Sequence, residues 1–243
     1  MPALVSVIIP ALDEEAALPG TIRSCREAGA CEVVVVDGGS ADRTAEIARA
    51  MADTAVSAPR GRARQMNAGA AAARGQILLF LHADTALPPG GLADVAGALG
   101  DPAVVGGAFR VELVPSPAES PYTRAALRVV GRGIGLRSRL TRSYTGDQAI
   151  FLRAAAFREV GGYPGIPLME DVELSRRMAR AGKTVLLARR VRSSGRRWEA
   201  WGPARTVAAM WRLRVAYLLG RTPDWCAERY RREPARLPGN RLR

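Results

Sequence analysis

The chain has 243 residues, 48% of them hydrophobic, which suits one globular core with at most a small appendage. Its formal net charge of +13 is uneven: residues 1–110 carry 9 Arg against 12 Asp or Glu, and residues 111–243 carry 27 Arg or Lys against 11 acids. The basic half predicts an anionic partner, namely nucleic acid, an anionic membrane surface or a phosphorylated substrate. Aromatic residues are only 5% of the chain and no ribonucleoprotein strand motif is present, so we do not expect nucleic acid to be the partner.

The predicted compartment follows from the N-terminus and the cysteines. Residues 1–10 read as a strand rather than as a secretion leader, and three cysteines without paired spacing indicate reduced thiols. No apolar run approaches the roughly 20 residues that a spanning helix needs. We therefore predict a cytoplasmic protein, either free or peripheral at the inner face of the membrane.

The first two predicted strands are rich in β-branched residues, at residues 4–10 and 32–37, and helical patterns follow them at residues 18–28 and 42–51. This alternation predicts an α/β fold, with a Rossmann-like, mostly parallel sheet flanked by helices. Acidic residues stand at or just past the strand ends, so a ligand-binding edge is expected there.

The loop after the second strand, Asp37-Gly-Gly-Ser-Ala-Asp-Arg-Thr44, is ordinary turn chemistry when taken alone. Neither early strand is followed by Gly-x-Gly-x-x-Gly or by a P-loop lysine. The sequence therefore does not favour a nicotinamide dinucleotide enzyme or an ATP hydrolase.

Three arginines, Arg60, Arg62 and Arg64, precede an alanine-rich helix that is expected to end before Gly75. Positive charge at a helix start is suited to a nucleotide or a diphosphate, although such arginines can also be merely solvated. The next apolar run ends in His82-Ala-Asp84, which delivers a carboxylate to the strand end where a metal-bound phosphate would lie.

Glu170 and Asp171 begin a predicted helix over residues 170–181, after a loop rich in Gly and Pro. Acids at a helix start are often only partners of its dipole. Here the loop predicts a position at a cleft mouth, where one of the two could deprotonate a hydroxyl.

All four tryptophans lie in residues 198–243, around a helical pattern at residues 206–219. Two interpretations stay open for this segment. It is either a terminal helix that packs on the domain while its arginines extend outward, or a helix that lies in the membrane interface.

Taken in order, these motifs resemble family 2 glycosyltransferases with the GT-A fold over about residues 3–195. The motifs are residues 5–10 with Asp13-Glu-Glu15, then Val35-Val-Asp-Gly-Gly-Ser-Ala-Asp-Arg-Thr44, His82-Ala-Asp84, Phe157-Arg-Glu-Val-Gly-Gly-Tyr163 and Glu170-Asp171. Residues 81–85 and Gly146-Asp-Gln148 are most similar to the bacterial subgroup associated with radical-SAM or selenodomain proteins.

The resemblance implies roles for individual residues. Asp37 would bind the base or ribose of a nucleotide sugar, and Ala11 and Glu14 would frame the base. Asp84 would coordinate Mn²⁺ or Mg²⁺, which neutralises the departing diphosphate. Asp171 would be the general base of an inverting transfer.

Two features depart from the family pattern or match it weakly. His82 replaces the usual first Asp of Asp-x-Asp, so it is expected to contact ribose or phosphate or to ligate the metal. Arg196-Arg-Trp198 resembles the end of a motif of processive sugar synthases, and it places Arg197 on the diphosphate and Trp198 against the acceptor. Arg62 stays a predicted nucleotide contact.

The resulting prediction is a GT-A domain over residues 1–195, with a nucleotide-sugar half (1–110) and an acceptor half (111–195), followed by a basic, Trp-rich helical extension (196–243). The predicted function is inverting, metal-assisted transfer of a sugar from a nucleotide diphosphate sugar to an acceptor hydroxyl, on an acceptor that is lipid-linked or anionic. The alternative is a catalytically inactive module that binds a nucleotide sugar or nucleic acid.

Overall fold

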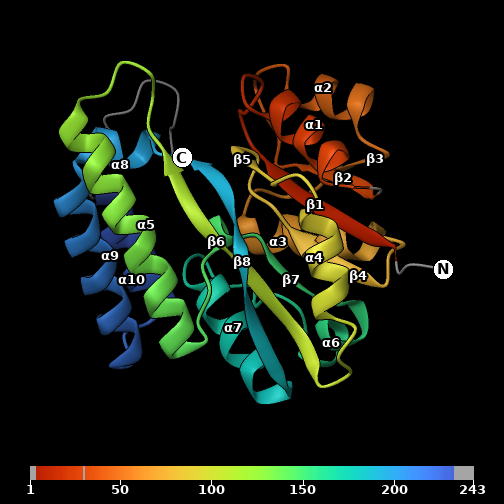
Figure 1. Ribbon diagram of the computed structural model, residues 1–243. Coiled ribbons are helices and arrows are strands. Elements are labelled where there is room, and N and C mark those ends of the chain that lie inside the picture. The colour runs from red at the N-terminus through yellow and green to blue at the C-terminus, as the bar shows by residue number, and fades with distance from the viewer. Residues whose placement is uncertain (1–3, 30, 233–243) are drawn as a thin grey trace.

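A computed structural model describes residues 4–29 and 31–232 of the chain (Figure 1). The strands are β1 (Val5–Ala11), β2 (Glu32–Asp37), β3 (Thr54–Ser57), β4 (Ile77–Phe80), β5 (Thr85–Ala86), β6 (Val104–Val114), β7 (Ile150–Arg153) and β8 (Lys183–Ser194). The helices are α1 (Leu18–Ala28), α2 (Thr44–Met51), α3 (Arg62–Ala72), α4 (Gly91–Ala98), α5 (Pro121–Thr141), the 3₁₀ turn η1 (Gly146–Gln148), α6 (Ala154–Glu159), α7 (Glu170–Ala181), α8 (Arg196–Trp201), α9 (Pro203–Leu218) and α10 (Pro223–Arg232).

Within the described residues the strands form one sheet in the order β3-β2-β1-β4-β7-β6-β8-β5. The strands β1 to β4 pair in parallel, as do β6 and β8, whereas β7 is antiparallel to both of its neighbours and β5 is antiparallel to β8. The predicted α/β fold with a mostly parallel sheet is therefore confirmed. The first strand is displaced by one residue, since it occupies Val5–Ala11 rather than residues 4–10.

Every residue of β1 and β2 is buried because helices cover both faces of the sheet, and this explains their continuous apolar sequence. Successive side chains of a strand point to opposite faces. Val7 and Ile9 accordingly pack in one cluster with α1 and α4, whereas Ile8 packs in a second cluster with α3.

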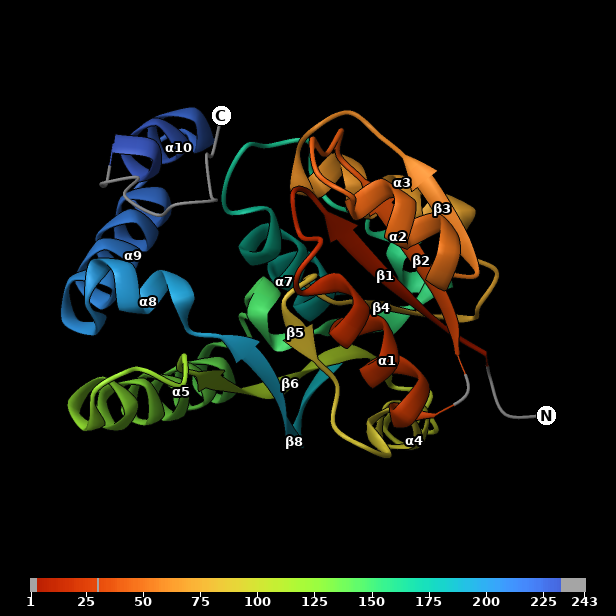
Figure 2. The same cartoon turned by 90° about the horizontal axis from the view of Figure 1, so that it is seen from above.

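The helices after β8 lie with α5 on the side of the molecule away from α1 and α4, as the two views agree (Figures 1 and 2). There α9 lies against α5 and α10, and Leu213, Cys226 and Tyr230 form a small third apolar cluster. The domain boundary predicted at residue 195 stays a prediction. None of the described helices is both long and apolar enough to span a membrane.

Gln65 fixes the position of α3 against the ends of two strands. Its Nε2 donates hydrogen bonds of 2.9 Å to the backbone carbonyls of Ala11 and Val36, at the carboxyl ends of β1 and β2. The start of α3 is thereby held at the sheet edge where parallel α/β sheets bind ligands.

A substitution at Gly69 can test how closely α3 packs against the sheet. A Cβ at Gly69 would lie 2.4 Å from Cγ2 of Ile8, so Gly69→Ala forces the helix off β1 and is expected to lower the free energy of unfolding by about 1–3 kcal/mol. In α4, a Cβ at Gly97 would meet nothing within 4 Å, so Gly97→Ala should instead stabilise by about 0.5–1 kcal/mol. Denaturant unfolding of both variants checks this, and equal effects would contradict the packing described.

Candidate functional site

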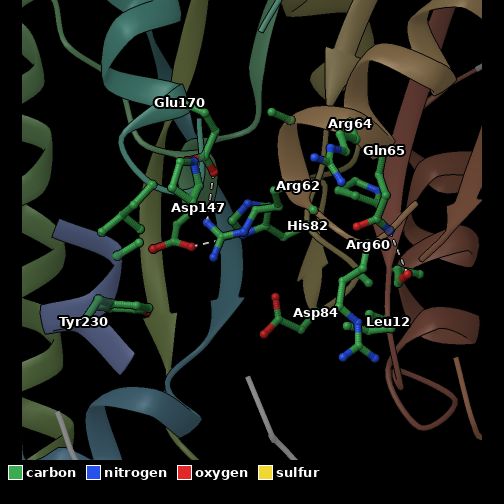
Figure 3. Close-up of a pocket in the computed structure, with 18 of the residues that line it drawn as sticks. Leu12, Arg60, Arg62, Arg64, Gln65, His82, Asp84, Asp147, Glu170 and Tyr230 are labelled. Carbon is green, nitrogen blue, oxygen red and sulfur yellow. Dashed lines mark hydrogen bonds and ion pairs between the residues drawn. The ribbon is translucent and has the colours of Figure 1, made fainter. Parts of the chain in front are cut away.

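A cavity of about 650 Å³ opens at the carboxyl edge of β1 and β4. Its walls come from the ends of these strands, the start of α3, the turn η1, the loop before α7, and helices α8 and α10. Figure 3 shows Asp147, Glu170 and Tyr230 on one side, Arg60, Arg64 and Gln65 on the other, and Arg62 and His82 between them. Acidic and basic groups therefore face one another across the cavity.

The basic wall is the start of α3. Gly61 precedes the helix with a φ of 135°, which a glycine adopts readily. No side chain caps the N-terminus of the helix. The first N–H groups of a helix have no partner within the helix, and they carry the positive end of its dipole. Together with Arg62 and Arg64, which also line the cavity, they make a site suited to a diphosphate.

Asp84 and Glu14 share one guanidinium. Arg196 Nη2 lies 3.1 Å from Asp84 Oδ2 and also contacts a carboxylate oxygen of Glu14. Burial and the Asp84 charge raise the pKa of Glu14, although Arg196 opposes the shift. Both acids line the cavity, as the sequence predicts, but the arginine that pairs with them is not among the predicted residues.

His82 lines the cavity but is directed toward Asp147. Its Nδ1 lies 3.2 Å from Asp147 Oδ1, and its Nε2 is buried without a partner against Gly146, where a Cβ would lie 2.3 Å away. Burial alone would raise the pKa of Asp147, but the His82 hydrogen bond and the charges of His82, Arg197 and Arg62 lower it to about 2. Both ring nitrogens of His82 thus face protein atoms.

Glu170 is buried in the cavity wall, where Arg62 Nη1 lies 3.4 Å from its Oε1. Burial raises the pKa of Glu170, Arg62 lowers it and Asp171 raises it again. The sequence places this pair of acids at a cleft mouth, whereas Glu170 lies at 3% exposure.

Asp171 and Asp37, unlike the other predicted site residues, do not line this cavity. Asp171 Oδ2 accepts a 3.0 Å hydrogen bond from the Gly146 N–H, and its Oδ1 accepts one of 2.7 Å from the Val172 N–H. Asp37 accepts hydrogen bonds from the N–H groups of Gly39 and Ser40, at 3.1 and 3.2 Å, and so holds its own loop. Their predicted roles stay predictions.

The remaining predicted residues, Ala11, Arg62 and Arg197, do line the cavity. The Arg197 guanidinium stacks over the ring of Tyr230, 5.5 Å from its centroid. Trp198 also lines the cavity, but it is only 8% exposed and packs in the core cluster of α1 and α4, which leaves little of it for an acceptor.

Sequence reasoning missed three residues of the cavity: Arg196, Asp147 as the partner of His82, and Tyr230. Asp147 had a signal, because the Gly146-Asp-Gln148 string stands among the family-like motifs, and Arg196 had a weak one, because it opens the Arg196-Arg-Trp198 motif. Tyr230 is brought in by a helix far along the chain, and no local pattern marks it.

No group of three or more His, Cys, Asp or Glu side chains is arranged for a metal among the residues described. Asp84 and Glu14 nevertheless converge on one positive group, Arg196, and carboxylate oxygens are the donors that Mg²⁺ and Mn²⁺ prefer. This pair fits a divalent cation that takes its other ligands from a bound diphosphate and water.

The fold and cavity define an α/β protein with a site for a phosphorylated ligand at its sheet edge. The profile described as "Glycosyl transferase family 2" matches residues 6–160, well over half of the chain. The chain therefore belongs to glycosyltransferase family 2.

Two curated relatives bear the name "Undecaprenyl-phosphate 4-deoxy-4-formamido-L-arabinose transferase". The relative from Pseudomonas paraeruginosa is 41% identical over an alignment of 99 residues. The alignment covers 35% of this chain and 29% of that protein. One from Pseudomonas aeruginosa is 40% identical over 99 residues, with the same shares. The chain thus matches less than a third of the length of either relative.

Solved structures share the fold at low sequence identity. The mannosyltransferase PcManGT of Pyrobaculum calidifontis, in complex with GDP-Man and Mn²⁺, superimposes with a TM-score of 0.64 and 20% identity, over 94% of this chain and 73% of that one. S. aureus TarS 1-349 in complex with UDP-GlcNAc superimposes with a TM-score of 0.60 and 18% sequence identity, over 79% of this chain and 58% of that one. These similarities confirm the GT-A fold.

The lowered pKa of Asp147 predicts how its contribution to stability depends on pH. The folded value of about 2 lies below the ordinary 3.8, so ionised Asp147 stabilises the fold above about pH 4, and this stabilisation is lost as the pH falls toward 2. Asp147→Asn should therefore lower the free energy of unfolding at neutral pH, and the difference from wild type should shrink between about pH 4 and 2. Urea unfolding over this range measures it, and a difference independent of pH would rule out the pairing with His82.

Proposed function

We propose that this protein is an inverting glycosyltransferase that transfers a sugar from a nucleotide diphosphate sugar to an acceptor hydroxyl. The observation that carries the proposal is the cavity, where the arginine-rich start of α3 faces the carboxylates Asp84 and Glu14. The start of α3 can bind a diphosphate, and the two carboxylates can hold a cation beside it. The nucleotide-sugar donor is supported by neighbours of the same fold that are complexed with UDP-GlcNAc and GDP-Man.

In this proposal the base and ribose lie at Ala11 and Asp37, and the diphosphate lies between Arg62 and Arg197. Glu14, which the sequence assigns to the base, is assigned to the cation instead because it shares Arg196 with Asp84. The Asp171 carboxylate takes the proton of the acceptor hydroxyl. The acceptor oxygen bonds to the anomeric carbon while the bond from that carbon to the diphosphate breaks, and the nucleoside diphosphate leaves with the bonding electrons. Attack from the face opposite the leaving group inverts the configuration.

A divalent cation, Mn²⁺ or Mg²⁺, would be held by Asp84 and Glu14 and would neutralise charge on the leaving diphosphate. Support for it comes from the two carboxylates on Arg196 and from the neighbour complexed with GDP-Man and Mn²⁺. His82 contributes by holding Asp147. The predicted direct contact of His82 to ribose or phosphate would require its ring to turn away from Asp147. The radical-SAM- and selenodomain-associated subgroup also stays a prediction.

The proposed acceptor is presented at an anionic membrane surface on the cytoplasmic side. Apart from Leu4, the exposed large apolar side chains of the described residues lie on α5 (Tyr122, Val129, Leu136 and Leu140), on α9 (Trp211, Val215 and Leu218) and directly after α9 (Leu219). Their spacings, near seven on α5 and four and three on α9, place each set on one helix face. We call these two sets the apolar faces.

Charge selects a bilayer over a second copy of the chain as the partner of these faces. Exposed arginines, including Arg128, Arg132 and Arg139 on α5, lie beside the apolar side chains. A second copy would bring like charges together, whereas anionic headgroups attract them. The relatives named as undecaprenyl-phosphate transferases support a lipid-linked acceptor.

The base assignment predicts a selective loss in Asp171→Asn. The amide keeps the shape of the side chain but cannot take the proton, so transfer should fall about 10²-fold or more while donor binding persists. Release of nucleoside diphosphate from a donor panel, with calorimetric binding of UDP and GDP alongside, measures the two effects separately. Normal transfer by this variant would move the base to Asp147 or Glu170, which line the cavity.

The membrane assignment predicts reversible binding to anionic vesicles that weakens as salt screens the attraction. The double variant Leu140→Ser with Trp211→Ser removes one large side chain from each apolar face, and its partition coefficient should fall about tenfold or more. Leu4→Ser, which removes an exposed apolar side chain away from these faces, is the matched control and should bind as wild type does. If the protein sediments equally with neutral and anionic vesicles, or with neither, a soluble acceptor becomes the better proposal.

A further inference from the structure

Two arginines outside the donor cavity converge on the segment that links α5 to η1. Arg137, from α5, donates through Nη2 to Gln148 Oε1 at 3.3 Å and to the Ser143 carbonyl at 3.5 Å. Arg214, from α9, donates through Nη2 to the hydroxyl of the same Ser143. The two guanidinium groups therefore meet at one residue.

This pair of positive charges lacks an anion. Among the described residues no carboxylate lies within ion-pair distance of either guanidinium, and Arg137 Nε is buried without a hydrogen-bond partner. Burial and the Arg214 charge lower the pKa of Arg137 to about 10, and burial lowers that of Arg214. Two half-buried cations side by side are costly unless an anion joins them.

The pair is close to the proposed base. The Asp171 carboxylate raises the pKa of both arginines, although by less than burial lowers it. Ser143 lies three residues before Gly146, whose N–H donates to Asp171, and Asp147 follows in the wall of the donor cavity. Asp171 thus lies near the arginine pair and is hydrogen-bonded to the turn that carries Asp147 of the donor cavity.

The pair also borders the apolar faces. Leu136, 60% exposed, directly precedes Arg137, and Val215, 46% exposed, directly follows Arg214. Neighbouring residues of a helix point about 100° apart, so each helix directs an apolar side chain outward and a guanidinium toward its neighbour. An anionic group on an amphiphilic molecule would match this arrangement.

We infer that Arg137 and Arg214 bind a phosphate group of the acceptor and thereby hold its hydroxyl at Asp171. This inference rests on the proposed function and names the chemistry of the acceptor. Guanidinium groups bind phosphate through paired N–H donors, and the free Arg137 Nε is one more donor of this kind. The phosphate can belong to a lipid headgroup or to a soluble phosphate ester.

The direct test measures phosphate binding while the donor cavity is filled. Wild-type protein saturated with UDP or GDP and Mn²⁺ is titrated calorimetrically with glucose 6-phosphate and, below its micelle concentration, with dodecyl phosphate. At least one probe should bind, and Arg137→Gln and Arg214→Gln should each weaken binding more than tenfold. Arg180→Gln, an exposed arginine at the end of α7, is the matched control and should stay within twofold. Tighter binding of the dodecyl ester indicates a lipid source, and equal binding indicates a soluble one.

A second variant separates an anion site from a merely structural pair. Ser143→Asp supplies a fixed carboxylate between the guanidinium groups, so phosphate binding should fall more than tenfold while the melting temperature rises. If the pair were only structural, the melting temperature would rise in the same way, but phosphate binding would stay unchanged.

Failure of phosphate binding in a wild-type protein that binds nucleotide would overturn the inference, as would unchanged binding in both glutamine variants. Failure to bind UDP or GDP would instead overturn the proposed function. The nucleotide titration that precedes the phosphate titration keeps these two outcomes apart.

Discussion

Arg196 holds two carboxylates, Glu14 and Asp84, that follow the ends of two adjacent strands, β1 and β4. Without a cation these acids would repel each other in a partly buried place, and burial already raises the pKa of Glu14. The same constraint recurs across the cavity, where Arg62 accompanies Glu170 and His82 accompanies Asp147. Each acidic wall segment is therefore stabilised by a hydrogen-bond donor or a positive group that another element brings to it.

This arrangement determines how the cavity responds to a ligand. A diphosphate brings negative charge, so it competes with the carboxylates for Arg196 and Arg62, and the acids then need another cation. A divalent ion meets that need, which is why a cation and a diphosphate are expected to bind together rather than separately. The positive start of α3 is held to the strand ends by Gln65, through hydrogen bonds that do not involve these ion pairs.

The sequence predicts the first half of the fold well because β1, β2 and α3 are marked by local patterns, namely β-branched runs and helical periodicity. It also predicts Asp84, Glu14 and Arg62 as site residues, next to a strand end or a helix start, and all three line the cavity. The contacts of Arg196 and Tyr230 lie beyond such reasoning, because they depend on how α8 and α10 pack.

The second half of the fold is harder to predict from the sequence, because its features also depend on how helices pack. The pattern places a basic, Trp-rich extension after residue 195, but it does not show that α9 of this extension packs against α5, the other helix with exposed apolar side chains. The pairing of Arg137 with Arg214 depends on the same packing. Their separation of 77 residues in sequence leaves no local sign of it.

The most direct test of this account is a calorimetric titration of UDP and GDP into wild-type protein, with Mn²⁺ and with a chelator, repeated on Asp84→Ala. The account predicts that one nucleotide binds, that Mn²⁺ strengthens its binding about tenfold or more, and that Asp84→Ala abolishes this enhancement. Equally tight nucleotide binding with Mn²⁺ and with chelator would contradict the coupling of cation and diphosphate at Asp84.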